Sequence, residues 1–195
     1  MQCSPPDARE LPDGLDYVNA YVSQDIAQML VRRVDAAPWR TDLKRRVQHY
    51  GYRYDYKARR VGRRDALGAL PAAYRALAER LVTDGYFDLL PDQVIVNEYL
   101  PGQGISAHID CVPCFGDTIA SLSLLSACVM RFVRPSALQQ MDLHLQPESL
   151  LVLRGAARHF WTHAIPARKT DVVEGRRHWR SRRISLTFRR VTLSD

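Results

Sequence analysis

One stretch of the sequence, residues 97–124, concentrates side chains that bind metals or change redox state. His108 and Asp110 stand two residues apart, so on a β-strand both side chains point to the same side and can meet one cation. Cys111 and Cys114 form a C-x-x-C motif directly behind them. Three kinds of site are compatible with these residues: an iron site with oxygen and nitrogen ligands, a sulfur-rich zinc site and a redox-active dithiol.

The His-x-Asp pair becomes a stronger indication when a second histidine approaches it from a neighbouring strand. His159 and His163 are the candidates, whereas His144 and His178 are less well placed. Two histidines and one carboxylate on one face of a β scaffold form the ligand set of non-haem Fe(II) oxygenases. The alternative is structural: His108 caps a turn, and the second histidine is satisfied in the core.

The composition is that of an ordinary globular protein. The 195 residues are 46% hydrophobic and 25% charged, and this length suits one domain with a full core. No run approaches about 18 consecutive apolar residues, and the start, MQCSPPDARELPDG, has no apolar stretch typical of a secretory signal. Four cysteines in a chain of this length do not predict a disulfide framework. These observations predict a cytoplasmic, reduced, monomeric protein without a membrane segment.

Positive charge is concentrated in two segments. Residues 40–64 hold 10 Lys/Arg against 2 Asp/Glu, and residues 167–190 hold 9 against 2. These segments carry +8 and +7, so the rest of the chain sums to about −8 within the net charge of +7. The distribution favours a polyanionic partner, and the alternate tyrosines of residues 50–56 are suited to stacking on exposed bases. A solvated basic face, with these tyrosines on a half-buried strand, explains the same pattern without a partner.

The elements that must position these residues follow the order helices first, strands later. The segment 23–37 predicts a helix with a serine N-cap and with Ile26, Leu30 and Val34 on one face. A second helix is expected over residues 71–85, which begin with a proline and end with a glycine.

Extended structure is expected in the rest of the chain. Residues 45–57 alternate aromatic with polar side chains and predict two short strands around Gly51. From Gln93 onward the pattern is β-rich, without the alternation of strands and helices that a parallel doubly wound sheet requires. The clearest runs are VIVNEYL, ASLSLLSACVMRFV, SLLVLRG and RRISLTFRRV. Helices followed by about seven or eight short strands predict a single α+β domain whose β part is a sandwich or a jelly roll.

Several ordered motifs in residues 94–191 resemble the AlkB family of Fe(II)- and 2-oxoglutarate-dependent dioxygenases. They are Asn97-Glu98-Tyr99, Pro101-Gly102, His108-x-Asp110 followed by the SLSL strand, Trp161-Thr162-His163, and Arg183-Ile-Ser-Leu-Thr187-Phe-Arg189. NEYLPGQGISAHID and RISLTFRRV look closest to the branch that includes the eukaryotic tRNA wobble-uridine hydroxylase. The upstream HYGYRYDY is similar, more loosely, to the base-contacting lid of the family.

The resemblance implies a fold and a set of cofactors. It implies an α+β chain with a double-stranded β-helix (jelly-roll) core and supporting N-terminal helices. Residues 1–195 would form one dioxygenase domain, with helices and a substrate lid in 1–92 and the catalytic core in 93–191. The implied metal is Fe(II), with 2-oxoglutarate and O2 as cosubstrates.

The resemblance also assigns roles to individual residues. His108, Asp110 and His163 match the iron ligands, which leaves His159 as the weaker candidate. Arg183 matches the arginine that pairs with the distal carboxylate of 2-oxoglutarate, a task suited to a guanidinium group. The other cosubstrate positions are Asn97, Tyr99, Thr187 and Arg189.

The last β-rich run predicts a strand with two different faces. Residues 183, 185, 187 and 189 alternate with Ile184, Leu186 and Phe188, which we expect on the core side. Ser185 departs from the family pattern, because many members have asparagine at this position.

The C-x-x-C motif is left without a clear site. A zinc site needs four ligands and His108 already matches an iron ligand, while a thioredoxin-like motif requires a βαβ context that is absent here. We therefore expect Cys111 and Cys114 to be ordinary thiols close to the iron site.

The implied substrate is a base in nucleic acid. The expected reaction is the oxidative dealkylation of alkylated bases in DNA or RNA. Alternatives are the hydroxylation of a modified tRNA wobble uridine, the same chemistry on a protein or small-molecule substrate, and a nucleic-acid-binding module without activity. The candidate substrate-contacting residues are Tyr52, Tyr54, Arg59 and Arg60.

Overall fold

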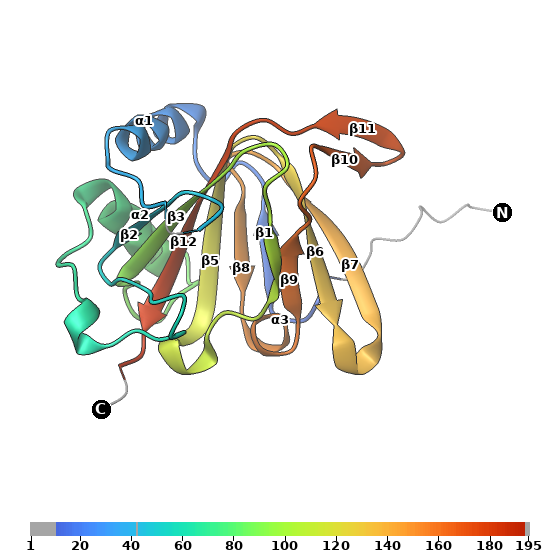
Figure 1. The fold of residues 1–195 in the computed structure, drawn as a ribbon. Coiled ribbons are helices and arrows are strands. Elements are labelled where there is room, and N and C mark those ends of the chain that lie inside the picture. The colour runs from blue at the N-terminus through green and yellow to red at the C-terminus, as the bar shows by residue number, and fades with distance from the viewer. Residues whose placement is uncertain (1–10, 42, 194–195) are drawn as a thin grey trace.

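Two β-sheets face each other in the computed structural model, which describes residues 11–41 and 43–193 (Figure 1). In sheet order, the larger sheet consists of β1 (Leu15–Val18), β8 (Leu150–Leu153), β5 (Phe115–Leu125), β12 (Arg183–Val191), β3 (Gln93–Tyr99) and β2 (Val47–Tyr50). The smaller sheet consists of β4 (Ile105–His108), β9 (Thr162–Ile165), β6 (Cys128–Arg134) and β7 (Gln139–Leu145). A separate hairpin is formed by β10 (Thr170–Val173) and β11 (Arg176–Trp179).

β12 lies in the centre of the larger sheet and pairs antiparallel with β5 and β3. Its Ile184, Leu186 and Phe188 are buried in the core on one side of the sheet. Residues 183, 185, 187 and 189 face the opposite way and line a cavity. The strand with two different faces that the sequence predicts is confirmed.

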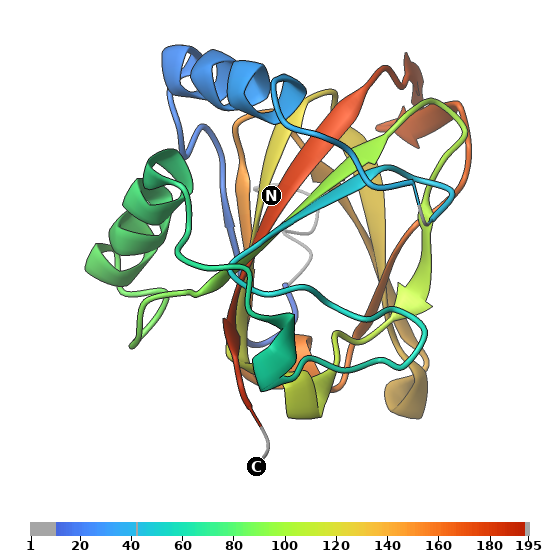
Figure 2. The same ribbon diagram turned by 60° about the vertical axis from the view of Figure 1, so that its left-hand side comes forward.

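Two helices, α1 (Gln24–Asp35) and α2 (Ala72–Thr83), cover the outer face of the larger sheet (Figure 2). They confirm the two helices expected from the sequence. The remaining helical pieces are short: α3 (Gly155–His159) and the 3-10 turns Arg63–Asp65, Val112–Cys114 and Pro135–Ala137. Among the described residues, no helix combines the length and the apolar character that a membrane crossing requires.

The buried face of α1 differs by one position from the expected one. Ser23 caps the helix as predicted, since its hydroxyl accepts a hydrogen bond from the backbone N–H of Ile26 at 3.3 Å. Leu30 and Val34 are buried, but Ile26 is 36% exposed and Ala27 takes its place in the core. The expectation for Ile26 is wrong because residues 27, 30 and 34, spaced i, i+3 and i+7, form the stripe that meets the sheet.

A second core fills the space between the two sheets. Phe132 of β6 is fully buried there, with Leu151 and Leu153 contributed by β8. One face of the larger sheet thus packs on the helices and the other on the smaller sheet. This is the double-stranded β-helix (jelly-roll) architecture that was expected, and the fold prediction is confirmed.

The strand predictions need two corrections. Only β2 forms within residues 45–57, because the chain turns at Gly51. The backbone φ angle of Gly51 is +77°, and the carbonyl group of Asp92 occupies the space that a Cβ atom would need there, so only glycine fits. After Gly51 the predicted second strand is replaced by turns with isolated bridges. From Gln93 onward the described residues form ten strands rather than seven or eight, since several four-residue strands are too short to show a periodicity. β1 and β2, which precede residue 93, also join the larger sheet.

Candidate active site

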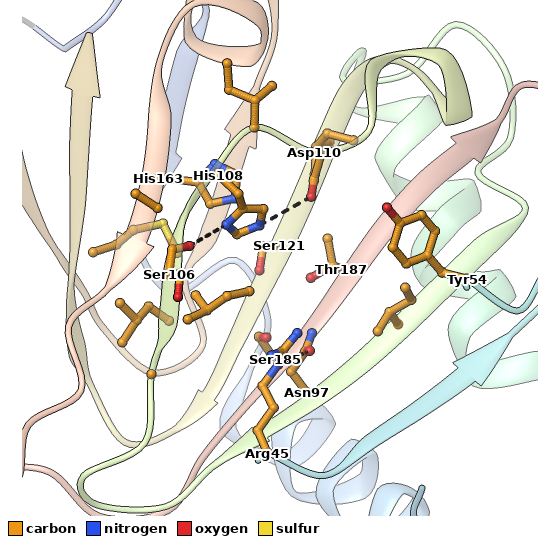
Figure 3. Close-up of a pocket in the computed structure, with 18 of the residues that line it drawn as sticks. Arg45, Tyr54, Asn97, Ser106, His108, Asp110, Ser121, His163, Ser185 and Thr187 are labelled. Carbon is orange, nitrogen blue, oxygen red and sulfur yellow. Dashed lines mark hydrogen bonds and ion pairs between the residues drawn. The ribbon is translucent and has the colours of Figure 1, made fainter. Parts of the chain in front are cut away.

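A cavity of about 840 Å³ opens between the two sheets (Figure 3). Larger-sheet strands β3 and β12 line one side of it, and β4 and β9 of the smaller sheet line the other. All eight residues that the family resemblance assigns to metal and cosubstrate contribute to its lining: Asn97, Tyr99, His108, Asp110, His163, Arg183, Thr187 and Arg189. The fold therefore brings together side chains that lie up to 92 positions apart in the sequence.

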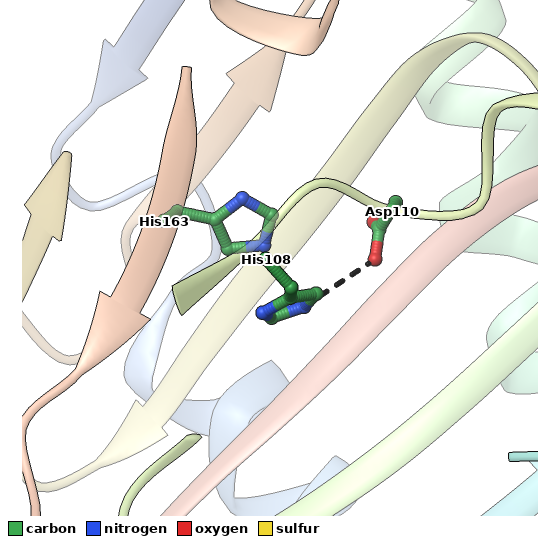
Figure 4. Close-up of side chains that lie close together, drawn as sticks. All are labelled: His108, Asp110 and His163. Atoms are coloured by element: carbon green, nitrogen blue, oxygen red, sulfur yellow. Dashed lines mark ion pairs between the residues drawn. The ribbon is translucent and has the colours of Figure 1, made fainter. Parts of the chain in front are cut away.

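The proposed metal ligands form a compact triad in this cavity (Figure 4). One ligand atom from each of His108, Asp110 and His163 lies within 4.8 Å of the others. His108 ends β4 and is paired in register with His163 of β9, which places the two imidazole centroids 4.3 Å apart. Asp110 follows β4 directly, with a carboxylate oxygen 3.7 Å from Nε2 of His108. Two nitrogens and one oxygen on one side of an open cavity match the facial arrangement that Fe(II) oxygenases use.

The other histidines lie away from this triad. His159, the alternative ligand, has its Nε2 3.3 Å from a carboxylate oxygen of Asp117. His144 and His178 contact each other, with ring centroids 5.7 Å apart. None of the three lines the cavity.

Neighbouring groups orient the ligands. The carbonyl of Ser106 accepts a hydrogen bond from Nδ1 of His108 at 2.8 Å, which leaves Nε2 as the unprotonated nitrogen that a metal requires. The buried Arg158 donates through Nη1 to the backbone carbonyl of Asp110 at 2.9 Å. Arg189 lies 3.3 Å from both carboxylate oxygens of Asp110. Arg158 was missed by the sequence analysis, because nothing in its local context marks it as buried.

The protonation states of the triad suit a metal. Burial tends to raise the pKa of Asp110, but the positive charge of Arg189 and the two neighbouring histidines outweigh it, so this pKa lies well below its usual range. Burial and the adjacent His108 lower the pKa of His163 to about 4. Near neutral pH the carboxylate is therefore ionised and the His163 imidazole is neutral, which are the forms that bind a cation.

Arg183 has an incomplete set of hydrogen bonds. Its side chain is 3% exposed and stacks over the ring of Tyr99 at 5.4 Å, while Nη2 donates to the hydroxyl of Ser123 at 2.8 Å. Nε and Nη1 are also buried, and they have no hydrogen-bond partner among the described residues. Buried donors of this kind are costly unless something accepts from them, and a carboxylate is the strongest common acceptor for guanidinium N–H groups. The site therefore fits the distal carboxylate of 2-oxoglutarate.

Arg45 is a further cavity residue, which sequence reasoning did not single out. Its Nε donates to the side-chain oxygen of Asn97 at 2.9 Å, and its guanidinium lies 5.9 Å from the ring centroids of both Tyr56 and Tyr99. The sequence does not distinguish Arg45 from the adjacent Arg46, which pairs with Glu98 instead of lining the cavity.

The four candidate substrate-contacting residues divide into two groups. Tyr54 and Arg59 line the cavity, whereas Tyr52 and Arg60 are not among its lining residues. The ring of Tyr54 packs against Phe115, with centroids 5.6 Å apart. Only half of the predicted substrate contacts thus lie at the cavity.

The expectation of two ordinary thiols is wrong, because Cys111 and Cys114 are joined by a disulfide. A single 3-10 turn, Val112–Cys114, brings their Cα atoms to 5.2 Å, within the range that a disulfide spans. The carbonyl oxygen of Arg59 lies 3.4 Å from both sulfurs, so the disulfide contacts the segment that carries this candidate substrate-contacting residue. Cys128 is buried and free, and Cys3 lies outside the described residues.

Much of the positive charge in the second basic segment, residues 167–190, is internal. Arg180 pairs with the buried Asp171, and Arg182 pairs with both Asp35 and Glu98. In residues 167–190 the exposed basic residues are Lys169, Arg176, Arg177 and Arg190. In residues 40–64, by contrast, every basic residue except Arg45 is exposed: Arg40, Lys44, Arg46, Arg53, Lys57, Arg59, Arg60, Arg63 and Arg64.

Comparison with known proteins agrees with this geometry. Residues 14–189 match the model of the 2OG-Fe(II) oxygenase superfamily. The alkylated DNA repair protein ALKBH8 homolog of Arabidopsis thaliana is 39% identical, over 91% of this chain and 58% of its own length. The tRNA (carboxymethyluridine(34)-5-O)-methyltransferase ALKBH8 of Mus musculus is 37% identical, over 94% of this chain and 29% of its own. The chain thus spans less than two thirds of either relative.

Solved structures agree at the level of the fold. The structure of OsALKBH1 superposes with a TM-score of 0.68 and 18% identity, covering 92% of this chain and 97% of that one. The match to the superfamily model agrees with the triad and with the unpartnered arginine nitrogens, and the solved structure agrees with the two sheets. The chain belongs to the 2OG-Fe(II) oxygenase superfamily and is an AlkB-family Fe(II)/2-oxoglutarate dioxygenase close to the ALKBH8 branch.

Proposed function

We propose that this dioxygenase oxidises a C–H bond on a base of nucleic acid and that tRNA is its substrate. The observation that carries the proposal is the aromatic and basic wall of the cavity, where Tyr54, Tyr56 and Arg59 share one space with the triad. An unpaired base requires ring faces for stacking and cations near its phosphates. The names of both relatives concern nucleic acid, and the name of the mouse protein concerns a tRNA uridine.

In this proposal the protein binds and orients the reactants. His108, Asp110 and His163 hold Fe(II), which together with 2-oxoglutarate and O2 supplies the oxidation of C–H to C–OH. Arg183 would pair with the distal carboxylate of the cosubstrate through its buried guanidinium group, whose Nε and Nη1 have no partner among the described residues. Arg189 keeps Asp110 ionised through its charge.

The fate of the hydroxylated carbon separates the two candidate reactions. On an N-alkyl group the product collapses and releases an aldehyde, which is the repair-type reaction that the name of the Arabidopsis relative favours. On a side-chain methylene of a wobble uridine the hydroxyl group stays. We place tRNA hydroxylation first, because an anticodon loop presents its bases without the cost of flipping them from a duplex.

The deciding experiment is turnover of 2-oxoglutarate with bulk tRNA and with a panel of alkylated oligonucleotides, followed by mass spectrometry of the nucleosides. We expect succinate formation with tRNA and a nucleoside that has gained one oxygen atom. Aldehyde release from an oligonucleotide, with tRNA unchanged, would establish the repair-type reaction instead. No product from either class would refute the proposal.

Replacing Tyr54 by alanine should raise the KM for the nucleic acid about 5- to 150-fold, which corresponds to the ~1–3 kcal/mol of a stacked base. The expected reason is loss of the ring that packs on Phe115 at the cavity wall. Tyr54→Phe is the matched control, because it keeps the ring and loses only the hydroxyl. Equal KM values for the wild type, Tyr54→Ala and Tyr54→Phe would exclude stacking on this residue.

A further inference from the structure

The hairpin formed by β10 and β11 is held to the body of the protein by a buried ion pair. Asp171 of β10 is 2% exposed and accepts from Arg180 at 2.6 and 2.7 Å. Arg168 donates to the same carboxylate at 2.7 Å, as does the backbone N–H of Val129 in β6 at 3.1 Å. The hairpin projects from the upper right in Figure 1, yet its base is fixed rather than loosely attached.

The strand register divides the hairpin into two faces. Asp171 is paired with His178, and Val172 is paired with Arg177. Paired residues lie on the same face of a sheet and successive residues on opposite faces. The face of Asp171 and His178 is therefore the anchored one, because Asp171 holds the ion pair and His178 contacts His144.

The other face of the hairpin is open. It consists of Thr170, Val172, Arg177 and Trp179. Trp179 is 75% exposed and Val172 is 62% exposed, although both are large apolar side chains. Arg177 makes no ion pair or hydrogen bond with any residue in the described part of the chain. A rigid strand pair that presents an indole ring next to an unpaired guanidinium group can bind a polymer that carries both aromatic rings and negative charges, because the rings stack on the indole and the charges pair with the guanidinium.

We propose that this open face binds single-stranded nucleic acid that flanks the oxidised base, with a base stacked on Trp179 and a phosphate bound by Arg177. The proposal rests on the nucleic-acid substrate proposed above and extends it to a second contact. Charge complementarity favours this occupant over an apolar protein surface, since Lys169, Arg176 and Arg177 are exposed here against the single acid Glu174.

The hairpin also connects to the cavity. The backbone N–H of Gly102 donates to the carbonyl of Arg168 at the hairpin base, at 3.2 Å. The next residue, Gln103, donates through its side chain to the carbonyl of Lys44 at 2.8 Å. Lys44 lines the cavity together with Arg45. One turn thus links the base of the hairpin to the cavity wall.

The test is binding of bulk tRNA and of a single-stranded oligouridine to the full chain, followed by tryptophan fluorescence. Trp161 is buried and Trp39 packs on the core, so the exposed Trp179 should account for most of the quenching that stacking produces. We expect Trp179→Phe to remove most of this quenching and Trp179→Ala to weaken binding about 5- to 150-fold. Thermal unfolding of each variant checks that the fold is retained.

Arg177→Ser and Arg176→Ser form a matched pair, because they remove the same charge from opposite faces. Arg177→Ser should reduce the slope of log affinity against log salt by about 0.7 to 0.9, the value of one phosphate contact, whereas Arg176→Ser should keep the wild-type slope. If the wild type binds and oxidises tRNA while the Trp179 and Arg177 variants bind like the wild type, the hairpin contact is refuted and the proposed function stands. If the wild type neither binds nor oxidises nucleic acid, both proposals fail.

Discussion

Asp110→Ala and His163→Ala should each reduce Fe(II)-dependent succinate formation to below about 1% of the wild-type rate. Loss of a group that only orients a metal ligand lowers metal affinity or activity about 10- to 100-fold. Loss of the ligand itself should therefore lower activity at least about 100-fold. Each variant removes one of the three ligand atoms that lie within 4.8 Å of one another. The measurements are metal content after anaerobic loading with Fe(II), and succinate release under O2.

His159→Ala is the matched control for the metal prediction. This histidine pairs with Asp117 outside the cavity, so the variant should bind iron and form succinate as the wild type does. Full activity of His163→Ala together with an inactive His159→Ala would show that the ligand assignment is wrong. Circular dichroism of all three variants separates loss of iron from loss of the fold.

Arg183→Lys should weaken the affinity for 2-oxoglutarate about tenfold or more, a free-energy change of about 1.4 kcal/mol or above. Lysine keeps the positive charge but presents a single nitrogen. It cannot reproduce the two buried donors, Nε and Nη1, that have no partner among the described residues. The affinity is read from the dependence of succinate formation on 2-oxoglutarate concentration.

Arg182→Lys provides the comparison for this change. Arg182 is adjacent in sequence, but it pairs with Asp35 and Glu98 and does not line the cavity. Its lysine variant should retain the wild-type affinity for 2-oxoglutarate. An unchanged affinity in Arg183→Lys would remove Arg183 from the cosubstrate site.

Local periodicity explains what the sequence could predict. The alternation of polar and apolar residues in β12 is a property of the strand itself, so its two faces follow from the order of residues alone. The same holds for His108 and Asp110, which are two positions apart. His163 is different: its pairing with His108 is set by the register of β4 and β9, and this register depends on contacts between distant segments. Spacing alone therefore left His159 and His163 as equal candidates, and only the family resemblance separated them.

Tertiary contacts explain what the sequence could not predict. The Cys111–Cys114 disulfide depends on a Cα separation that the turn creates. The charge count of residues 167–190 overstated their exposed charge, since Arg180 and Arg189 pair with buried aspartates. The β10–β11 hairpin escaped prediction because each strand has four residues and mixes charged with apolar side chains.

The position of β12 has a consequence for how the chain is synthesised. It is the last described strand along the chain, yet it lies between β3 and β5 in the middle of the larger sheet. On the ribosome, β3 and β5 are therefore made before the strand that joins them, and their inner edges stay unpaired until residue 191 has emerged. Unpaired strand edges are sites for pairing with other chains. Because Arg183 and Arg189 are on this same strand, the cavity lining is completed in the same step that closes the sheet.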